Sequence, residues 1–321
     1  MSFFLGVDGG GSKTAFVLLN DSGHIVAETQ TPSCYYFSEG IELVGRILTQ
    51  GIDTITAQAG IETKDIDQAF FGLPGYGEVS SDIERLNAVP RAVLGHDRYT
   101  CDNDMVCGWA GSLGAVDGIN VISGTGSMTY GERAGHGHRV GGWSELFGDE
   151  GSAYWIAIRG LNAFTRMSDG RLPRGPLYDV VKARADVNSD LDLIDVVVNR
   201  WKGQRGAIAD LSKTVVEAAA QGDLIAAQIL TDACAELARI VDTTRTELGF
   251  GDDDTVPVSY SGGMFTAAAV RSGFEEALSA LPPKYELRTP LFGPAVGAAL
   301  YAAKKAGTPL SEAALAQLRS H

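Results

Sequence analysis

The stretch that decides the fold is FFLGVDGGGSKTAFVLL, residues 3–19. It reads as an apolar strand, a tight glycine turn carrying a serine and a lysine, and a second apolar strand. A Walker A loop requires a glycine directly before the lysine and a helix after the hydroxyl residue. Here Ser12 precedes Lys13, residues 15–19 read as a strand, and the GxGxxG pattern also fails. The segment therefore predicts a β-hairpin whose turn can bind phosphate.

The composition is that of a globular protein with room for two domains. The chain has 321 residues, 45% of them hydrophobic and 21% charged, and a formal net charge of −14. No run approaches the 18 or more apolar residues of a membrane span. The negative charge disfavours nucleic acid and anionic membranes as partners. An anionic ligand such as ATP would need a local pocket rich in hydrogen-bond donors, or a cation.

The four cysteines point to a reducing compartment. Cys34, Cys101, Cys107 and Cys234 are scattered and form no CxxC pair, which argues against a zinc or iron–sulfur site. The chain also opens without a basic and then apolar export signal, so we expect a cytoplasmic protein.

A second copy of the opening pattern begins at residue 119. INVISGTGSMTYGERAGHGHRVGGW, residues 119–143, repeats the order strand, glycine turn, strand, turn, strand seen in LGVDGGGSKTAFVLLNDSGHIV, residues 5–26. Such self-similarity is sought before any fold is named. It predicts an internal duplication; the alternative is chance, because glycine turns between strands are common.

The remaining patterns complete an α/β protein. Apolar strands are predicted over residues 3–7, 14–19 and 24–28, and an amphipathic helix over 39–59. Two long helices, over 207–220 and 223–248, are separated at Gly222. We expect two similar lobes, each a β-meander followed by helices, with a cleft between them, a usual place for ligands.

The two glycine turns are candidates for gripping a polyphosphate. Glycine lets backbone N–H groups approach phosphate oxygens without obstruction by a Cβ atom, and the hydroxyl and lysine side chains add donors. Each turn alone would be read as a plain hairpin loop; the pair, each after an apolar strand, favours phosphate binding. The residues concerned are Gly9, Gly10, Gly11, Ser12 and Lys13 in the first turn, and Gly124, Thr125, Gly126 and Ser127 in the second.

Two aspartates near strand ends are candidates for the chemistry. Asp8 lies beside the first turn and suits a hydrated Mg²⁺, although it could simply cap the turn. Asp104 lies where a short strand leads into a helix. It could cap that helix, or it could take a proton from an attacking hydroxyl group. Asp102 is the local competitor for the second role.

Residues 141–156, GGWSELFGDEGSAYWI, are suited to a sugar. Asp149 and Glu150 supply acceptors for hydroxyl groups, and Trp143 offers a flat face to C–H groups; the alternative is a helix-capping sequence with Trp143 in the core. Gly262 and Gly263, after a predicted strand, could let an adenine or ribose approach the backbone.

Together the motifs GVDGGGSKT, NDM…GWAGS, ISGTGS, GGW…GDEGSAYWI, SGG and PAVGAAL resemble, in order, those of the N-acetylglucosamine kinases and BadF/BadG-type ATPases of the actin–hexokinase–Hsp70 superfamily. The resemblance covers nearly the whole chain. It implies a two-lobed actin-like ATPase (ribonuclease H-like) fold, use of ATP with Mg²⁺, and a homodimer. The first lobe would comprise residues 1–115 and about 296–321, and the second 116–295.

The resemblance also assigns roles by position. Asp104 matches the aspartate that deprotonates the sugar 6-hydroxyl group, and Thr125 matches a residue that contacts ATP. Ala209 and Gly263 fall near the nucleotide. The positions that touch the sugar fall on Ser127, Met128, Gly142, Trp143, Ser144 and Asp149.

Two departures from the family pattern leave the sugar open. Cys34 or Tyr35 stands where an asparagine contacts the sugar, and Met128 stands where a polar residue is usual. We expect an ATP-dependent kinase that phosphorylates the 6-hydroxyl group of an amino sugar, first of all N-acetylglucosamine. Glucosamine, N-acetylmuramate and glucose are the alternative substrates. The alternative functions are an activator ATPase of the BadF type and a sugar-sensing regulator.

Overall fold

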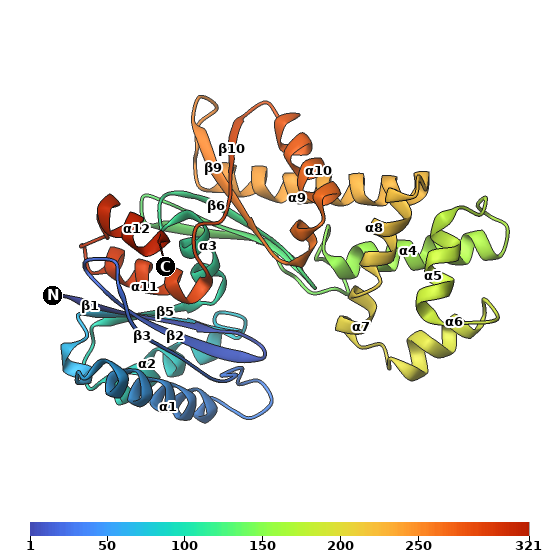
Figure 1. The fold of residues 1–321 in the computed structure, drawn as a ribbon. Helices are drawn as coiled ribbons and strands as arrows, with labels where there is room; N and C mark the ends of the chain where they lie inside the picture. Colours follow the sequence, from blue (N-terminus) through green and yellow to red (C-terminus); the bar gives the residue numbers. More distant parts are fainter. Residues whose placement is uncertain (321) are drawn as a thin grey trace. The chain divides into compact units, whose positions relative to one another are not determined.

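The computed structural model describes residues 1–320, which divide into two compact units (Figure 1). The first unit consists of Met1–Asp117 and the segment from Thr289 onward, and the second of Gly118–Arg288. The sequence suggested limits after residues 115 and 295. Each unit contains a five-stranded mixed sheet with its own hydrophobic core.

The first sheet has the strand order β3-β2-β1-β4-β5. Strands β1 to β3 form an antiparallel meander, and β4 and β5 continue the sheet parallel to β1. Parallel strands need crossover connections, which the helices between them supply. The strands are β1 Phe3–Gly9, β2 Lys13–Asn20, β3 Ile25–Pro32, β4 Gln68–Leu73 and β5 Tyr99–Asn103.

The second sheet repeats this topology. Its order is β10-β9-β6-β7-β8, with β6 to β8 antiparallel and β9 and β10 parallel to β6. Strand for strand, this is the arrangement of the first sheet, so the predicted duplication of a β-meander is confirmed. The strands are β6 Gly118–Ser123, β7 Ser127–Arg133, β8 His136–Gly141, β9 Thr255–Ser261 and β10 Lys284–Arg288.

Helices cover both faces of the first sheet. On one face lie α1 (Glu42–Ala59) and α2 (Ile83–Leu94); on the other lie α3 (Met105–Leu113) and α11 (Pro294–Lys305), with α12 (Glu312–Arg319) at the end (Figure 1). The predicted helix over 39–59 is confirmed, but it begins at Glu42 because Gly40 adopts a left-handed backbone (φ 89°).

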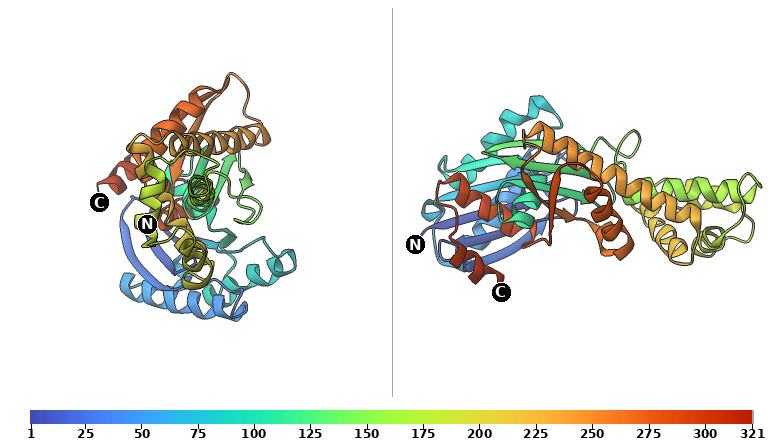
Figure 2. Two further views of the ribbon diagram at one scale, coloured as in Figure 1. Left: turned by 90° about the vertical axis from the view of Figure 1, so that its right-hand side faces the viewer. Right: turned by 90° about the horizontal axis from the view of Figure 1, so that it is seen from above.

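In the second unit, α9 (Leu224–Glu247) packs on the sheet, and a group of shorter helices precedes it in the chain. Figure 2 shows this group gathered at the N-terminal end of α9. It consists of α4 Ala153–Ser168, α5 Pro176–Ala185, α6 Asp192–Asp195, the π-helical turn η3 Val196–Arg200, α7 Arg205–Ala209 and α8 Ser212–Ala220. The turn η4 (Gly263–Thr266) and α10 (Ala268–Ser279) follow β9. No helix of residues 1–320 is long and apolar enough to cross a membrane.

The helix predicted over 207–220 is wrong in one respect, because the structure divides it into α7 and α8. Around the division the backbone forms 3₁₀-type hydrogen bonds between residues three apart. The Leu211 N–H donates to the Ile208 carbonyl, and the Lys213 N–H donates to the Asp210 carbonyl. The Thr214 hydroxyl group also donates to the Leu211 carbonyl, at 2.6 Å. A side chain that competes for a helical carbonyl in this way favours a tighter turn.

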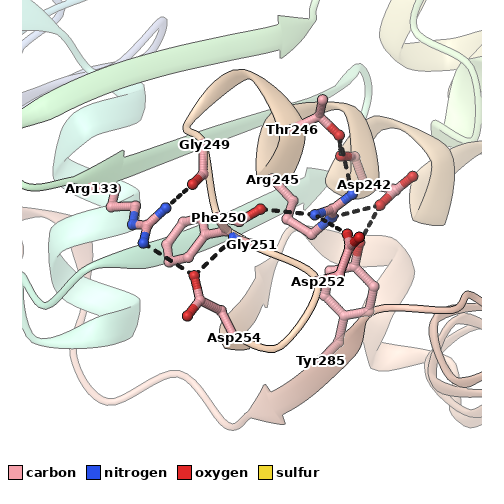
Figure 3. A network of polar contacts seen from close by, with 10 residues as sticks. All are labelled: Arg133, Asp242, Arg245, Thr246, Gly249, Phe250, Gly251, Asp252, Asp254 and Tyr285. Carbon is pink, nitrogen blue, oxygen red and sulfur yellow. Dashed lines mark hydrogen bonds and ion pairs between the residues drawn. The ribbon is translucent and has the colours of Figure 1, made fainter.

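A polar network fixes the loop after α9 to the second sheet (Figure 3). The Arg133 guanidinium of β7 binds the Gly249 carbonyl and Asp254, and it stacks on the Phe250 ring at 4.6 Å. Arg245 pairs with Asp242 at 2.9 Å, and the hydroxyl group of Tyr285 donates to the same carboxylate. The network contains no predicted site residue, which is consistent with a structural role.

Candidate functional site

The first glycine turn is built as the sequence predicts. It joins β1 to β2 and is closed by the Gly10 N–H, which donates to the Lys13 carbonyl at 2.8 Å. Gly9 has no room for a side chain, because a Cβ atom there would lie 2.6 Å from the Pro74 ring and 2.7 Å from the Cys34 sulfur. Gly11, Ser12 and Lys13 are exposed. The turn therefore presents a backbone without side-chain obstruction, a hydroxyl group and a cation.

Asp8 lies near the end of β1 with a thiol as its partner. Burial raises the pKa of the Asp8 carboxyl to about 6, although a hydrogen bond from Cys107 and the charge of Lys13 lower it. The buried Cys107 sulfur also lies 3.6 Å from the carbonyl oxygen of Val7. Since Cys107 is in α3, this contact links the first strand to the helix that follows Asp104.

Asp104 occupies the cap position of α3, directly after β5, but its side chain makes no capping hydrogen bond. Burial raises the pKa of its carboxyl to about 7; the negative charge of Asp8 adds to this, and the backbone N–H groups of Asp104 and Met105 oppose it. The competitor Asp102 accepts a hydrogen bond from the Asn103 N–H at 2.7 Å. Asp104 is thus the aspartate whose environment suits proton transfer near neutral pH.

Cys34, one of the two residues that stand at the expected asparagine position, lies beside these groups. Its side chain is buried, and its N–H donates to the Thr14 hydroxyl group at 3.1 Å. Burial raises the pKa of the Cys34 thiol to about 11, and the charges of Asp104 and Asp8 contribute. Tyr35, in contrast, is 40% exposed. Cys34 therefore brings a neutral thiol close to the two aspartates.

The second glycine turn joins β6 to β7 and is fixed to the loop that precedes α4. The hydroxyl group of Ser123 donates to the Gly151 carbonyl at 2.8 Å, and that of Ser127 donates to the Glu150 carbonyl at 2.7 Å. The Ala153 N–H donates to the Gly124 carbonyl at 2.8 Å. The candidate phosphate turn and the candidate sugar residues 149–152 thus form one bonded assembly.

A cavity of about 460 Å³ lies beside this turn. Four of the residues expected near a nucleotide contribute to its wall, namely Gly124, Thr125, Ala209 and Gly263. Its volume is in the range of small-molecule sites. The other lining residues are Ala153, Gly206, Asp210, Ser212, Lys213, Val216, Met264, Thr266 and Ala267. Gly262 packs against the turn instead. Its φ of 97° and the nearby Ser123 carbonyl group, which a Cβ atom would strike, both favour glycine at this position.

The loop of residues 142–152 exposes apolar side chains and buries a carboxylate. Trp143 is 70% exposed, so the alternative of a core tryptophan is not what the structure shows. The side chain of Met128 packs against Gly142, which leaves no room for a Cβ atom. Ser144 has a left-handed backbone, and its hydroxyl group lies 3.3 Å from the Glu145 carboxylate. The loop therefore brings together most of the positions expected to contact a sugar.

Asp149 is nearly buried and pairs with Arg205, which sequence reasoning missed. Only 3% of its side chain is exposed, and its carboxylate lies 2.5 Å from the guanidinium. Burial raises the pKa of Asp149, and the charge of Arg205 opposes this. The sequence also contains no sign that Cys107 hydrogen-bonds Asp8 or that Lys213 lines the cavity. Each of these partners lies far along the chain from the group it serves, so no local motif signals it.

Comparison with known proteins assigns the chain to a family. The model of the BadF/BadG/BcrA/BcrD ATPase family matches residues 5–302. The chain is similar to the N-acetyl-D-glucosamine kinase of Dictyostelium discoideum, with 28% identity over 93% of this chain and 97% of that protein. It is also similar to the N-acetylmuramic acid/N-acetylglucosamine kinase of Clostridium acetobutylicum, with 30% identity over 74% and 77% of the two chains.

A solved structure shares the fold. A protein of Chromobacterium violaceum, provisionally described as an N-acetylglucosamine kinase, superposes with a TM-score of 0.67 over 94% of this chain and 98% of its own, at 23% identity. The match to the family model spans both units and both glycine turns. This protein therefore belongs to the BadF/BadG/BcrA/BcrD ATPase family.

Proposed function

We propose that this protein is an ATP-dependent sugar kinase that phosphorylates the 6-hydroxyl group of an amino sugar, with N-acetylglucosamine as its favoured substrate. The observation that carries the proposal is Asp104, a carboxylate with a pKa raised to about 7 that does not cap the helix it precedes. The names of the relatives, all sugar kinases, support the substrate class.

In the proposed reaction, Asp104 orients the sugar hydroxyl group and accepts its proton as the oxygen attacks the γ-phosphorus of ATP. Catalysis of phosphoryl transfer is mostly positioning and charge stabilisation. A base with a pKa near 7 is ionised in most molecules at slightly alkaline pH, yet it is basic enough to take a proton. Turnover is therefore expected to rise with pH through about 7.

The two glycine turns would bind the triphosphate. Gly11 of the first turn and Gly124 of the second are unobstructed, with no atom closer than 3.9 Å to a Cβ position at either, and the first turn adds Ser12 and Lys13. The cavity beside Gly124 and Thr125 would take the nucleoside, with Ala209 and Gly263 in its wall. Lys213, also in the wall, brings a second cation near the phosphates.

The sugar would be held by the loop of residues 142–152. Trp143 offers an exposed aromatic face, and Asp149 offers a carboxylate oriented by Arg205. Met128, which stands where a polar residue is usual, is partly exposed and would present weakly polar surface to the ligand. That surface favours a substrate with an apolar group, such as the acetyl methyl group of N-acetylglucosamine.

Asp8 fits a Mg²⁺ ion, which would neutralise charge on the phosphates during transfer. The residue supplies one carboxylate at a strand end beside the turn, and Mg²⁺ takes one or two carboxylates together with waters and phosphate oxygens. Within residues 1–320 no three His, Cys, Asp or Glu side chains form a cage for an ion, a pattern that Mg²⁺ does not require.

The activator ATPase finds less support than the kinase. The relatives of that type that the sequence suggested use paired cysteines for an iron–sulfur cluster. Here Cys34, Cys107 and Cys234 are buried, and burial raises the pKa of each thiol. Cys101 is partly buried, and its pKa is raised to about 12. Such thiols are poor metal ligands and poor nucleophiles.

Coupled measurement of ADP release tests the proposal with N-acetylglucosamine, glucosamine, N-acetylmuramate and glucose. We expect the highest kcat/KM with N-acetylglucosamine, and NMR of the product should show the phosphate on the 6-oxygen. ADP release that is independent of all four sugars would support the activator instead. A cytoplasmic homodimer completes the proposal, and light scattering of the purified protein tests the dimer.

A further inference from the structure

Arg205 lies at the first position of α7 and holds two carboxylates of the loop 142–152. Its guanidinium is 2.5 Å from the Asp149 carboxylate and 3.2 Å from that of Glu145. The guanidinium group is planar, permanently charged and able to donate in several directions at once. One side chain therefore pairs with two of the three acidic residues of this loop, Glu145 and Asp149.

Asp149 depends on this partner more than a surface carboxylate would. Its side chain is 3% exposed, and its backbone is left-handed (φ 55°), a conformation that non-glycine residues adopt rarely. The charged groups that act on it are Arg205, Glu145 and Glu150, and only the arginine favours its ionised form. The backbone of Ser144 also hydrogen-bonds the carboxylate, so without the guanidinium Asp149 would keep one partner and lose the one that carries a positive charge.

The same arginine also touches the candidate phosphate turn. A Cβ atom on Gly126 would lie 2.5 Å from a guanidinium nitrogen of Arg205 and 2.6 Å from an oxygen of Asp149. The ion pair thus rests directly against the turn, and a side chain at position 126 would have to displace it. Beyond Arg205, α7 contributes Gly206 and Ala209 to the wall of the nucleotide cavity.

We propose that Arg205 is a positioning residue that couples the nucleotide cavity to the sugar loop, because it orients Asp149 and Glu145 from the first turn of a helix that lines that cavity. The inference rests on the proposed kinase function. A nucleotide that fixes α7 and the Gly126 turn would also fix Arg205, and through it Asp149. Sugar should then bind more tightly to the nucleotide complex, and nucleotide more tightly to the sugar complex by the same factor.

A purely structural ion pair would behave differently. Replacing its arginine would lower stability, and it would weaken sugar binding equally with and without nucleotide. A coupling residue changes the ratio of the two affinities. Arg200 offers a matched control, since it pairs with Asp195 at 2.8 Å on the exposed turn η3 and touches neither the loop nor the cavity.

The test is isothermal titration of N-acetylglucosamine, with and without a saturating non-hydrolysable ATP analogue, on wild type, Arg205→Gln, Arg205→Lys and Arg200→Gln. We expect the analogue to tighten sugar binding by about 5–150-fold in wild type and Arg200→Gln, and by less than about 2-fold in Arg205→Gln. Arg205→Lys should keep part of the effect, because an ammonium group serves one carboxylate at a time.

Steady-state kinetics supply a second readout. We expect Arg205→Gln to raise the KM for sugar about 10–100-fold, with the affinity for the nucleotide alone changed by less than about 3-fold, equivalent to loss of one charge-assisted contact. Asp149→Asn should give a similar defect, and the double variant should be no worse than Asp149→Asn alone.

Wild-type coupling retained in Arg205→Gln would overturn the inference while leaving the kinase intact. The same holds if wild type phosphorylates the sugar but shows no coupling. If wild type neither binds nor phosphorylates any of the four sugars, both the inference and the proposed function fail. Thermal unfolding identifies a misfolded variant. If Arg205→Gln is misfolded, the nucleotide dependence of sugar binding in Arg205→Lys, which keeps the charge, tests the inference instead.

Discussion

Asp104 combines properties that stability alone would not favour. It is a carboxylate held where burial and the charge of Asp8 raise its pKa, and it gives no capping bond in return. Acids whose pKa is raised in this way cluster at sites of chemistry. If the proposal is right, replacing it should make the protein more stable and less active at once.

The pH dependence of stability tests the environment of Asp104. In the unfolded chain its pKa is near 3.8, and in the folded protein about 7. The free energy of unfolding therefore falls as pH rises from about 4 to about 7, because the folded state holds the proton longer. Asp104→Asn, which cannot ionise, should be about 1–4 kcal/mol more stable than wild type at pH 8, given about 1.4 kcal/mol per pKa unit.

Denaturant unfolding of both proteins at pH 4 and pH 8 measures this difference, which should disappear toward pH 4. Asp53→Asn is the control, since Asp53 is exposed on α1; it should stay within about 0.5 kcal/mol of wild type. Equal stability of Asp104→Asn and wild type at pH 8 would mean that the carboxylate is well solvated.

Individual residues differ in how far the sequence predicts them. Asp8, Asp104 and Asp149 can be singled out from the sequence, because each lies near the end of a predicted strand or shortly before a predicted helix. The partners Cys107 and Arg205 cannot be found in this way. The hydrogen bond of the Cys107 thiol to Asp8 and the ion pair of Arg205 with Asp149 depend on contacts between distant segments. The sequence contains those residues without any sign of what they face.

At the scale of elements, the site depends on how closely α11 approaches α3. Gly297 of α11 lies against Gly111 and the Cys107 carbonyl of α3, and a Cβ atom there would overlap backbone. Because α3 begins directly after Asp104 and carries Cys107, its position fixes both. The motif around Gly297 was recognised by resemblance, but only the packing shows that a glycine is needed at this point.

Gly297→Ala should therefore damage both stability and activity. We expect a loss of about 1–3 kcal/mol or more, as in overpacked interiors, together with a lower kcat. Gly45→Ala on α1 is the matched control, since a Cβ atom there would meet only Val89, at an ordinary 3.7 Å. It should be neutral or stabilising by up to about 1 kcal/mol. Thermal unfolding and turnover assays of the two variants make the comparison, and equal behaviour would contradict this packing.

The limits of sequence patterns are also visible at this scale. The β-meanders and α1 follow from alternation and helical spacing. The division between α7 and α8 does not follow from such patterns, because it depends on hydrogen bonds between residues three apart, and these leave no trace in the spacing of apolar residues. That division places Ala209 and Lys213 in the same cavity wall.

At the scale of the whole molecule, the duplication supplies one glycine turn in each unit. The proposal assigns both turns to the triphosphate, so variants in either unit should weaken ATP binding. We expect Lys13→Gln and Thr125→Ala each to raise the KM for ATP about 3–30-fold, the loss of one hydrogen bond or charge-assisted contact. The KM for sugar should change less. Steady-state kinetics decide, and a normal KM for ATP in either variant would remove that turn from the nucleotide site.

The overall topology was accessible from the sequence because the same pattern of strands and turns occurs twice in the chain. The repeated strand–turn–strand pattern predicted two similar halves, and both sheets show the same strand order. The family motifs then supplied the sugar kinase hypothesis. The identity of the sugar cannot be predicted from such a repeat, since it depends on a surface formed by Met128, Gly142, Trp143 and their neighbours.

The most direct test of the account is the turnover of Asp104→Asn with N-acetylglucosamine at pH 8, measured beside its affinity for nucleotide. If Asp104 is the base, kcat should fall about 10²–10⁴-fold while the dissociation constant of the nucleotide stays within about 3-fold. A variant that transfers phosphate at the wild-type rate would contradict the account.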